Sequence, residues 1–515
     1  MQNPHYIWLL PNKNSFIFTV FLLFSFNSFG QQVQENENKW YDDFKIDGYF
    51  QFQFAYTNKA DSLSLNSVNG GRFDRFSSNR FSIRRGRFQL QYEKKLVNSQ
   101  FSFDLTETGF RMKDSWLSIK DPKIKAFTLT TGIFARKFGQ ELEISSQDRE
   151  VPERSMIIQH LFPGIRDLGM NLEFRMPKGK KLHFLKLDAG IFHGTSGNLE
   201  ADNFKDFTGR IVIDNPFKGE KFKFKLGSSI YRGIVNHRYD IDGSAANYRT
   251  IWRTIDTVLN INGVDQSFTI MNQDILASDL ATILNNPSIA RATYNKNVQR
   301  NYYSFHSEFT WNGKTKKSNW GKTTIRGEYI FGQQVSLEGT LGNPYVFSSV
   351  SPTGPFSSVT WPKFDSPQPY NPATVSMQLK PSHTFVRNFR GWYLYLNKQL
   401  GNSKHYLVYR VDFYDPNTDV EGEQIALNVF DNNNNPVGSS GLSVADVAFT
   451  THLFTYRYEV NENLSLMFSF ERPINEKTKL DPLDSTQIGL GKYPHSGYLT
   501  NIKDDVFLIR MQYKF

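Results

Sequence analysis

The sequence predicts an all-β protein that crosses a membrane as an antiparallel β-barrel, and three features predict it. The last residues, 504–515, alternate apolar and polar side chains and end on an aromatic, Phe515. Many earlier segments show the same period of two, and the connections between them alternate between short and long. A membrane barrel requires this combination because its strands face lipid on one side and water on the other, with turns at one end and loops at the other.

The N-terminal residues have the pattern of a secretion signal. Lys13 supplies a positive charge, residues 16–24 form an almost unbroken apolar run, and Ser28 and Gly30 are small. The run is too short to cross a bilayer as a helix, so it predicts export and cleavage. The predicted organisation is a signal peptide over 1–30, a short periplasmic N-terminal lead over 31–43 and the barrel over 44–515.

Composition favours a polar interior over a soluble core. Only 39% of the residues are hydrophobic, yet 15% are aromatic, with 46 Phe and 24 Tyr. Aromatic girdles that face lipid around a polar lumen have this balance. The chain has no cysteine, which excludes a disulfide framework and a lipid-anchored cysteine. Its net charge of +10 favours anionic partners.

Period-two alternation over about ten residues identifies candidate strands along the whole chain. There are sixteen: residues 44–57, 80–93, 99–107, 110–120, 125–135, 166–176, 182–194, 205–214, 221–234, 298–312, 319–332, 384–399, 403–414, 446–460, 463–473 and 504–515. An even number places both ends of the chain on the periplasmic side of a bacterial barrel.

Connection lengths test this topology independently. The even-numbered connections are short and are predicted to be periplasmic turns: 94–98, 121–124, 177–181, 215–220, 313–318, 400–402 and 461–462. Most odd-numbered connections are long and are predicted to be extracellular loops: 58–79, 136–165, 235–297, 333–383, 415–445 and 474–503. A soluble sandwich has no reason to keep this alternation over such a length.

One candidate strand begins with alternating lysines. With the intervening aromatic and aliphatic side chains toward lipid, Lys221, Lys223 and Lys225 line the lumen side. The alternative is that the strand begins at the periplasmic rim, where these lysines extend to the interface or to water. The sequence leaves both placements open.

Arginines cluster near Gly86 in the strand predicted over 80–93. The apolar residues before this glycine and those after it have opposite parity, so the phase of the strand changes there. A bulge would turn neighbouring arginines of the set Arg84, Arg85 and Arg87 inward together. The alternative is that they lie high on the strand and contact lipopolysaccharide phosphates.

Several short motifs resemble the phosphate-selective porins O and P and their relatives in other Gram-negative groups. They are residues 84–87, 113–116, 131–134, 145–146, 153–155, 162–169 and 189–194. The resemblance covers much of 44–214 and beyond it rests on strand pattern and the terminal Phe515. It implies a sixteen-stranded trimeric porin whose third outer loop folds into the lumen and narrows it.

The resemblance also implies that arginines on the wall and on this loop form a ladder for phosphate or polyphosphate. By motif match, Arg84 and Arg85 would be wall arginines, and 136–165 would be the inserted loop. The loop carries four bases, Arg136, Lys137, Arg149 and Arg154, against five acids, Glu141, Glu143, Asp148, Glu150 and Glu153. These acids favour general anion preference over strict phosphate selectivity.

The sequence thus predicts a porin of the Gram-negative outer membrane through which small solutes, mainly anions, diffuse. Its expected partners are outer-membrane lipid and lipopolysaccharide, small anionic solutes, two further copies of the chain, and the barrel-assembly machinery, which Phe515 would engage. The alternatives are a general or neutral-solute porin, or a binding or adhesion barrel that acts through loops 235–297 and 333–383.

Catalysis is not expected from this sequence. His306 and Glu308 share strand parity, but Ser307 points the other way, so the three cannot converge. His495 and Ser496 in the last long loop are the other candidate pair. No metal, cofactor or nucleic-acid motif occurs in the sequence. We therefore expect that the protein is not an enzyme and binds no cofactor.

Overall fold

The computed structural model describes the chain in segments: residues 40–58, 73, 77–107, 109–196, 204–216, 221–237, 254–261, 264–271, 296–315, 318–337, 384–419, 421–422, 428–430, 436–439, 447–477 and 501–515. The predicted signal peptide and most of the predicted lead lie outside these residues. The chain divides into two compact units, Met1–Phe44 and Lys45–Phe515. The described part of the first unit is the 3-10 helix η1 (Trp40–Asp43) and Phe44.

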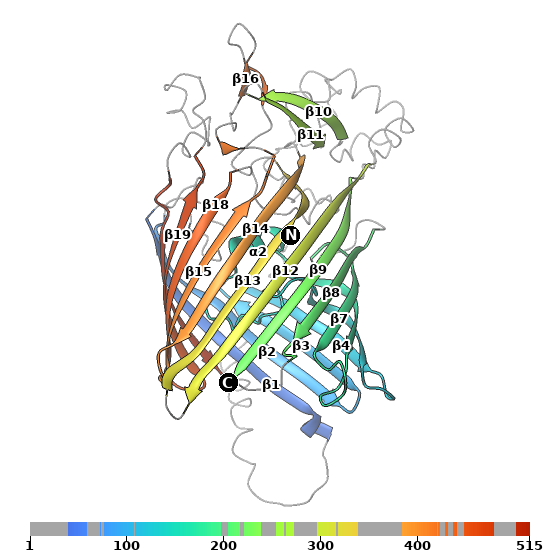
Figure 1. Cartoon of the computed structure of the whole chain (residues 1–515), viewed down its shortest axis with the longest axis vertical. Helices are drawn as coiled ribbons and strands as arrows, with labels where there is room; N and C mark the ends of the chain where they lie inside the picture. The colour runs from blue at the N-terminus through green and yellow to red at the C-terminus, as the bar shows by residue number, and fades with distance from the viewer. Residues whose placement is uncertain are drawn as a thin grey trace, which may run out of the picture. The chain divides into compact units, whose positions relative to one another are not determined.

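The second unit is a closed β-barrel (Figure 1). Its wall has sixteen strands: β1 (Phe44–Thr57), β2 (Asn79–Lys94), β3 (Val97–Thr106), β4 (Gly109–Lys120), β5 (Phe127–Ala135), β6 (Arg166–Arg175), β7 (Leu185–Phe192), β8 (Asp206–Asp214), β9 (Phe222–His237), β12 (Lys296–Thr315), β13 (Ser318–Leu337), β14 (Thr384–Gln399), β15 (His405–Asp415), β18 (Phe449–Glu459), β19 (Leu464–Asn475) and β20 (Val506–Lys514). Each of the sixteen predicted strands overlaps one of these, so the predicted fold class is confirmed.

The barrel closes where the last strand meets the first. β1 and β20 pair antiparallel from Tyr49 opposite Lys514 to Thr57 opposite Val506. Among the described wall strands, this closure leaves no edge whose unpaired backbone groups would face lipid, which a bilayer would penalise heavily.

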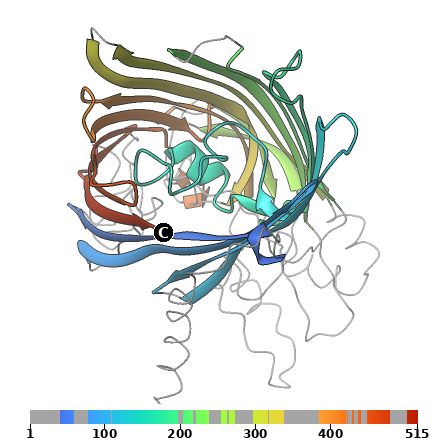
Figure 2. The same ribbon diagram turned by 90° about the horizontal axis from the view of Figure 1, so that it is seen from below.

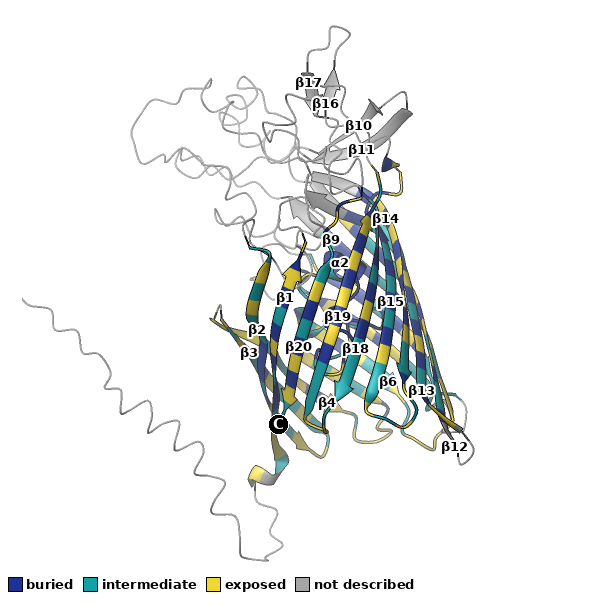
Figure 3. Cartoon of the chain, turned by 90° about the vertical axis from the view of Figure 1, so that its left-hand side faces the viewer, coloured by how far each residue is buried: buried dark blue, intermediate teal, exposed yellow. Residues whose placement is uncertain are grey.

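Alternation of side chains gives the wall two chemically different faces, visible as alternating bands in Figure 3. On β20, Phe507 and Met511 are 40% and 43% exposed, whereas Arg510 is 1% exposed on the opposite face. A one-residue slip would carry Arg510 to the lipid side, at a cost of roughly 2–4 kcal/mol at mid-depth. The period of two therefore fixes the register of the strand.

Two long connections contain structure that was expected to be loop. Within 235–297 lies a hairpin of β10 (Thr254–Ile261) and β11 (Val264–Met271), and 415–445 contains β16 (Asn428–Phe430) and β17 (Pro436–Ser439). The intervening sequence Asn262-Gly263 is a strong hairpin signal. Among the described residues, no helix is long and apolar enough to cross a membrane.

Candidate functional site

The connection between β5 and β6, residues 136–165, folds into the interior of the barrel (Figure 2). Its Gly139 backbone N–H donates to Ser229 Oγ on β9 over 3.0 Å. On the far side of the loop, Arg510 of β20 donates to the Pro152 carbonyl over 2.6 Å. Since β9 and β20 lie far apart around the barrel, the loop crosses the lumen.

The loop packs an apolar side against one part of the wall. Phe138 and Phe162 meet the stacked rings of Tyr231 on β9 and Tyr302 on β12, whose centroids are 5.1 Å apart. Helix α2 (Met156–Leu161) adds buried apolar side chains to the same cluster. Removal of this apolar surface from water holds the loop against β9, β12 and their neighbours.

One buried histidine belongs to this apolar contact. His160 of α2 stacks on Tyr414 of β15 at 5.3 Å and meets the ring edge of Phe449 at 5.6 Å. Burial lowers the pKa of His160 to about 3, because its charged form would lose its water. The imidazole is therefore neutral at neutral pH.

The opposite side of the loop leaves a cavity of about 1490 Å³ against β2 to β6. Its lining is rich in ionised side chains of both signs. The ten bases are Arg80, Arg84, Arg85, Arg87, Arg111, Lys113, Lys137, Arg149, Arg154 and Arg166. The five acids are Asp104, Asp114, Glu143, Glu153 and Glu173. The lining of this cavity therefore carries an excess of positive charge.

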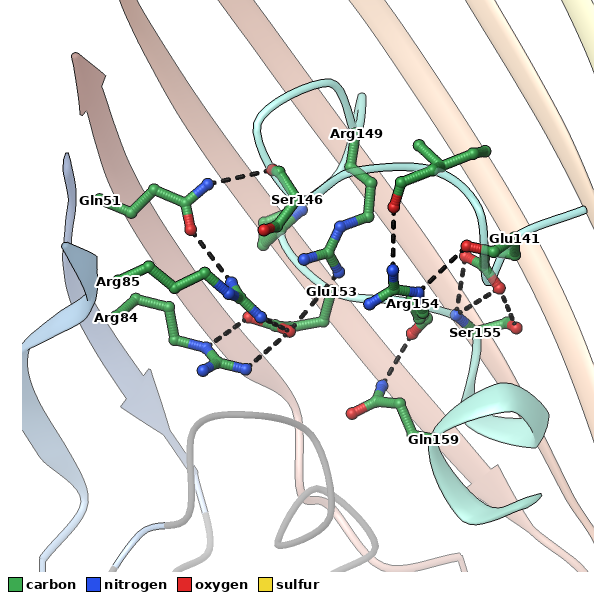
Figure 4. A network of polar contacts seen from close by, with 12 residues as sticks. Gln51, Arg84, Arg85, Glu141, Ser146, Arg149, Glu153, Arg154, Ser155 and Gln159 are labelled. Carbon is green, nitrogen blue, oxygen red and sulfur yellow. Dashed lines mark hydrogen bonds and ion pairs between the residues drawn. The ribbon is translucent and has the colours of Figure 1, made fainter. Parts of the chain in front are cut away.

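Glu153 lies at the centre of a cluster of arginines, part of which is shown in Figure 4. Arg84 forms a bidentate pair with it at 2.8 and 3.0 Å, and Arg510 approaches to 2.7 Å. Arg85 and Arg149 lie 3.7 Å from the same carboxylate. Burial alone would raise the pKa of Glu153, but the surrounding guanidinium groups outweigh burial and hold it well below its usual range.

The phase change predicted near Gly86 brings two consecutive arginines to one carboxylate. Phe81 is exposed outward before the glycine and Leu90 after it, although their parities differ. Arg84 and Arg85 both reach Glu153, and both line the cavity. The next predicted arginine, Arg87, lines the cavity as well.

The two other arginines of the loop that line the cavity have different partners. Arg154 donates to the backbone carbonyls of Glu141 at 3.1 Å and Ile144 at 2.9 Å, so it braces the loop. Burial lowers the pKa of Arg154 to about 10, against the attraction of Glu141, and burial together with repulsion from Arg154 lowers that of Arg149 to about 9. Arg154 thus combines a structural role with a place in the cavity wall.

Arg136, predicted to lie along an anion path, is not among the residues that line this cavity. It is fully buried and pairs with Asp167 at 2.8 Å, while it donates to the Gly164 carbonyl at 2.8 Å and to Ser196 Oγ at 2.9 Å. These bonds tie the two ends of the loop together.

Lys137 remains beside the cavity but is paired. Its Nζ lies 3.1 Å from Glu143, and Arg210 of β8 approaches the same carboxylate to 2.6 Å. Burial would raise the pKa of Glu143, yet Arg210 and Lys137 outweigh burial and hold it well below its usual range. Glu143 therefore stays ionised and offsets part of the positive charge.

The three lysines at the start of β9 lie apart from the cavity lining. Lys221 and Lys223 are exposed, next to the short connection 215–220, and Lys225 stands opposite Glu308 in the sheet register. Lys221 also lies 5.6 Å from the ring centroid of Phe222. This placement favours the rim interpretation.

Several cavity residues had not been singled out in the sequence. Asp104 accepts two bonds from the predicted Arg87 at 2.7 and 2.9 Å, and Arg166, which had not been singled out, pairs with Asp114 at 2.8 Å through two bonds. Further bases that line the cavity are Arg80, Arg111 and Lys113. Strand parity predicts that these side chains point inward. Nothing in the sequence indicates which part of the barrel wall the loop packs on and which part faces the cavity.

The catalytic candidates do not form a site among the described residues. His306 is buried toward the lumen, whereas Ser307 is exposed on the outer face. His495 and Ser496 lie outside the described residues. In the described segments, no group of three or more His, Cys, Asp or Glu side chains is arranged to hold a metal ion.

The fold and the site together define a transmembrane β-barrel with a loop folded into its lumen. No protein-family model and no curated protein matches the chain. The structure is similar to the outer membrane channel DcaP of Acinetobacter baumannii, with TM-score 0.44, 10% identity, and coverage of 92% of this chain and 97% of that chain. It is also similar to Salmonella typhi OmpF in complex with daunomycin, with TM-score 0.42, 8% identity, and coverage of 92% and 97%. For the trimer form of OmpT, an outer membrane protein of Vibrio cholerae, the TM-score is 0.40, identity 7%, and coverage 92% and 99%. Membership of the phosphate-selective porins O and P stays a prediction.

Proposed function

We propose that the protein is a porin of the Gram-negative outer membrane, whose water-filled channel passes small solutes with a preference for anions. One observation carries this proposal. Loop 136–165 packs its apolar side on one part of the wall, and the passage left on its other side is lined by ten bases against five acids. The loop thus narrows the lumen at the place where positive charge is concentrated.

An excess of fixed positive charge in a narrow passage favours anions in two ways. Low-dielectric walls focus the field and raise the local concentration of anions. Guanidinium groups supply planar donors that match the oxygens of carboxylate and phosphate ions. Fast conduction also needs several weak sites, since one tight site would hold the ion. Bases distributed over β2, β4, β6 and the loop meet this requirement.

The ion pairs in the passage favour general anion preference over strict phosphate selectivity. Arg87 is paired with Asp104 and Arg166 with Asp114, so two wall arginines are partly neutralised. A general or neutral-solute porin is the alternative that these pairs support. Preference for phosphate or polyphosphate is the narrower hypothesis, and it requires that phosphate compete with chloride for the passage.

Reversal potentials across a planar bilayer test the proposal. The purified protein in a KCl gradient should give potentials that show chloride to be more permeant than potassium. Assembly as a homotrimer and contact with lipopolysaccharide are further parts of the proposal. Native electrophoresis of the protein extracted in mild detergent tests whether it is a homotrimer. Detection of lipopolysaccharide that stays bound to the extracted protein tests the contact with lipopolysaccharide.

A further inference from the structure

Glu153 faces more positive charge than one carboxylate can neutralise. Arg84 and Arg510 hydrogen-bond to it, and Arg85 and Arg149 stand 3.7 Å away. Four guanidinium groups around a single carboxylate leave an excess of three positive charges. Further anions or solvent at the site would lower the repulsion among these charges.

Arg149 shows that donors in this cluster remain unused. It is 2% exposed and lines the cavity, yet within the described residues none of its three side-chain nitrogens has a hydrogen-bond partner. Its contact with Glu153 at 3.7 Å is an ion pair without a hydrogen bond. A buried guanidinium without a hydrogen-bond partner is costly, so this position suits an oxyanion that could accept its N–H groups.

We propose that the Glu153 carboxylate is a tethered competitor, which occupies the place among Arg84, Arg85 and Arg149 that a permeating oxyanion would take. The inference rests on the proposed anion channel and names the residue that sets how tightly the channel holds its solute. While Glu153 stays in place, an entering oxyanion reaches donors that are already partly used. Binding is therefore weak and release is fast, as conduction requires.

The loop is held near the wall by bonds that do not involve this carboxylate. Arg410 of β15 donates to the Glu153 backbone carbonyl at 2.7 Å, and Arg510 donates to the Pro152 carbonyl at 2.6 Å. These two bonds and the apolar packing remain when the side chain is changed to an amide. Removing the charge of Glu153 therefore tests competition separately from the position of the loop.

The matched control is Glu150, another carboxylate of the same loop. It pairs with Arg326 of β13 at 2.6 Å and is not part of the cavity lining. Both Glu150→Gln and Glu153→Gln remove one negative charge from the loop; the first breaks the pair with Arg326, and the second breaks the pairs with Arg84, Arg85 and Arg510. The difference is that only the Glu153 variant frees donors that line the passage.

The experiment measures block of chloride current by inorganic phosphate in planar bilayers. Glu153→Gln should lower the half-blocking phosphate concentration by at least about tenfold, since each freed charge-assisted hydrogen bond is worth about this factor or more. Glu150→Gln should stay within about twofold of the unmodified protein, since neither Glu150 nor its partner Arg326 lines the cavity and no donor is freed there. Both variants are first shown to assemble as heat-modifiable barrels.

The outcomes separate the two proposals. If the unmodified protein prefers potassium, the anion channel fails and the inference fails with it. If the unmodified protein prefers chloride but phosphate blocks the Glu153→Gln and Glu150→Gln variants equally well, only the tethered-competitor inference is overturned. Should Glu153→Gln not assemble, Glu153→Asp withdraws the carboxylate by one methylene. It should then strengthen phosphate block by a smaller factor, and unchanged block overturns the inference.

Discussion

The ring of Phe515 lies over Gly48, so close that a Cβ on this glycine would stand 2.6 Å from the ring carbon Cζ. The two residues also exchange backbone hydrogen bonds, from Gly48 N–H at 3.1 Å and from Phe515 N–H at 3.0 Å. The ring packs beside Phe50 and Phe88, with centroids 5.6 and 5.5 Å away. The last residue thus completes the seam that closes the barrel.

Deletion of Phe515 should therefore sharply lower the amount of assembled protein in the outer membrane. The change removes two backbone hydrogen bonds and the aromatic contact at the seam. The measurement is the fraction of heat-modifiable barrel in outer-membrane preparations. Phe305→Ala is the control, since Phe305 is 56% exposed on the outer face of β12, away from the seam. Normal assembly without Phe515 would refute the prediction that this residue acts as the assembly signal.

Shortening the inserted loop should enlarge the pore. Removal of about ten residues between Glu141 and Glu150 takes away part of the cavity lining and the pair between Glu150 and Arg326. Single-channel conductance should rise well above that of the unmodified protein, because the narrowest part of the passage is widened. A correctly folded variant with unchanged conductance would place the narrow part of the pore elsewhere.

Replacing Arg84 and Arg85 together by alanine should move the reversal potential toward cation preference. The change removes two of the ten cavity bases and leaves Glu153 with less positive charge around it. The loss per oxyanion site should be about 1–2 kcal/mol. Lys221→Ala with Lys223→Ala removes the same number of charges at the rim, where salt screens them. Equal shifts in both double variants would show that total charge, and not the cavity, sets selectivity.

Acid should weaken the packing of the loop through His160. Its pKa lies near 3 in the folded protein against an ordinary 6.5, so its stabilising contribution is complete above about pH 6.5 and is lost as pH falls. Each pH unit below 6.5 costs up to about 1.4 kcal/mol. His160→Phe keeps the ring beside Tyr414 without the titration. Its advantage in thermal midpoint over the unmodified protein should grow from pH 7 to pH 4, and a constant difference would contradict this role.

The sequence predicts the wall of the barrel better than its interior. Strand alternation depends on neighbours two residues apart, so the inward face of Arg510 is evident from its own strand. Its partner Glu153 lies 357 positions away in the chain, and no local pattern marks that pair. Arg136 shows the same limit, because its pairing with Asp167 appears only when both ends of the loop are placed.

The number of charged residues in the loop does not predict the net charge of the cavity lining. The four bases and five acids of 136–165 suggest near neutrality, whereas the cavity has twice as many bases as acids. The difference arises because the wall supplies Arg80, Arg111 and Arg166, and because Glu141 and Glu150 are not part of the cavity lining. Which side chains share a surface is decided by how the apolar side of the loop packs.

Ion selectivity at low salt tests the central claim most directly. The purified, assembled protein is placed in a planar bilayer between two KCl solutions of different concentration, and the reversal potential is read at low and at high ionic strength. The excess of bases in the cavity predicts that chloride is more permeant than potassium, with a preference that weakens as salt screens the charges. A potential showing potassium to be the more permeant ion at low salt would contradict the anion channel and leave a general or neutral-solute porin as the better description.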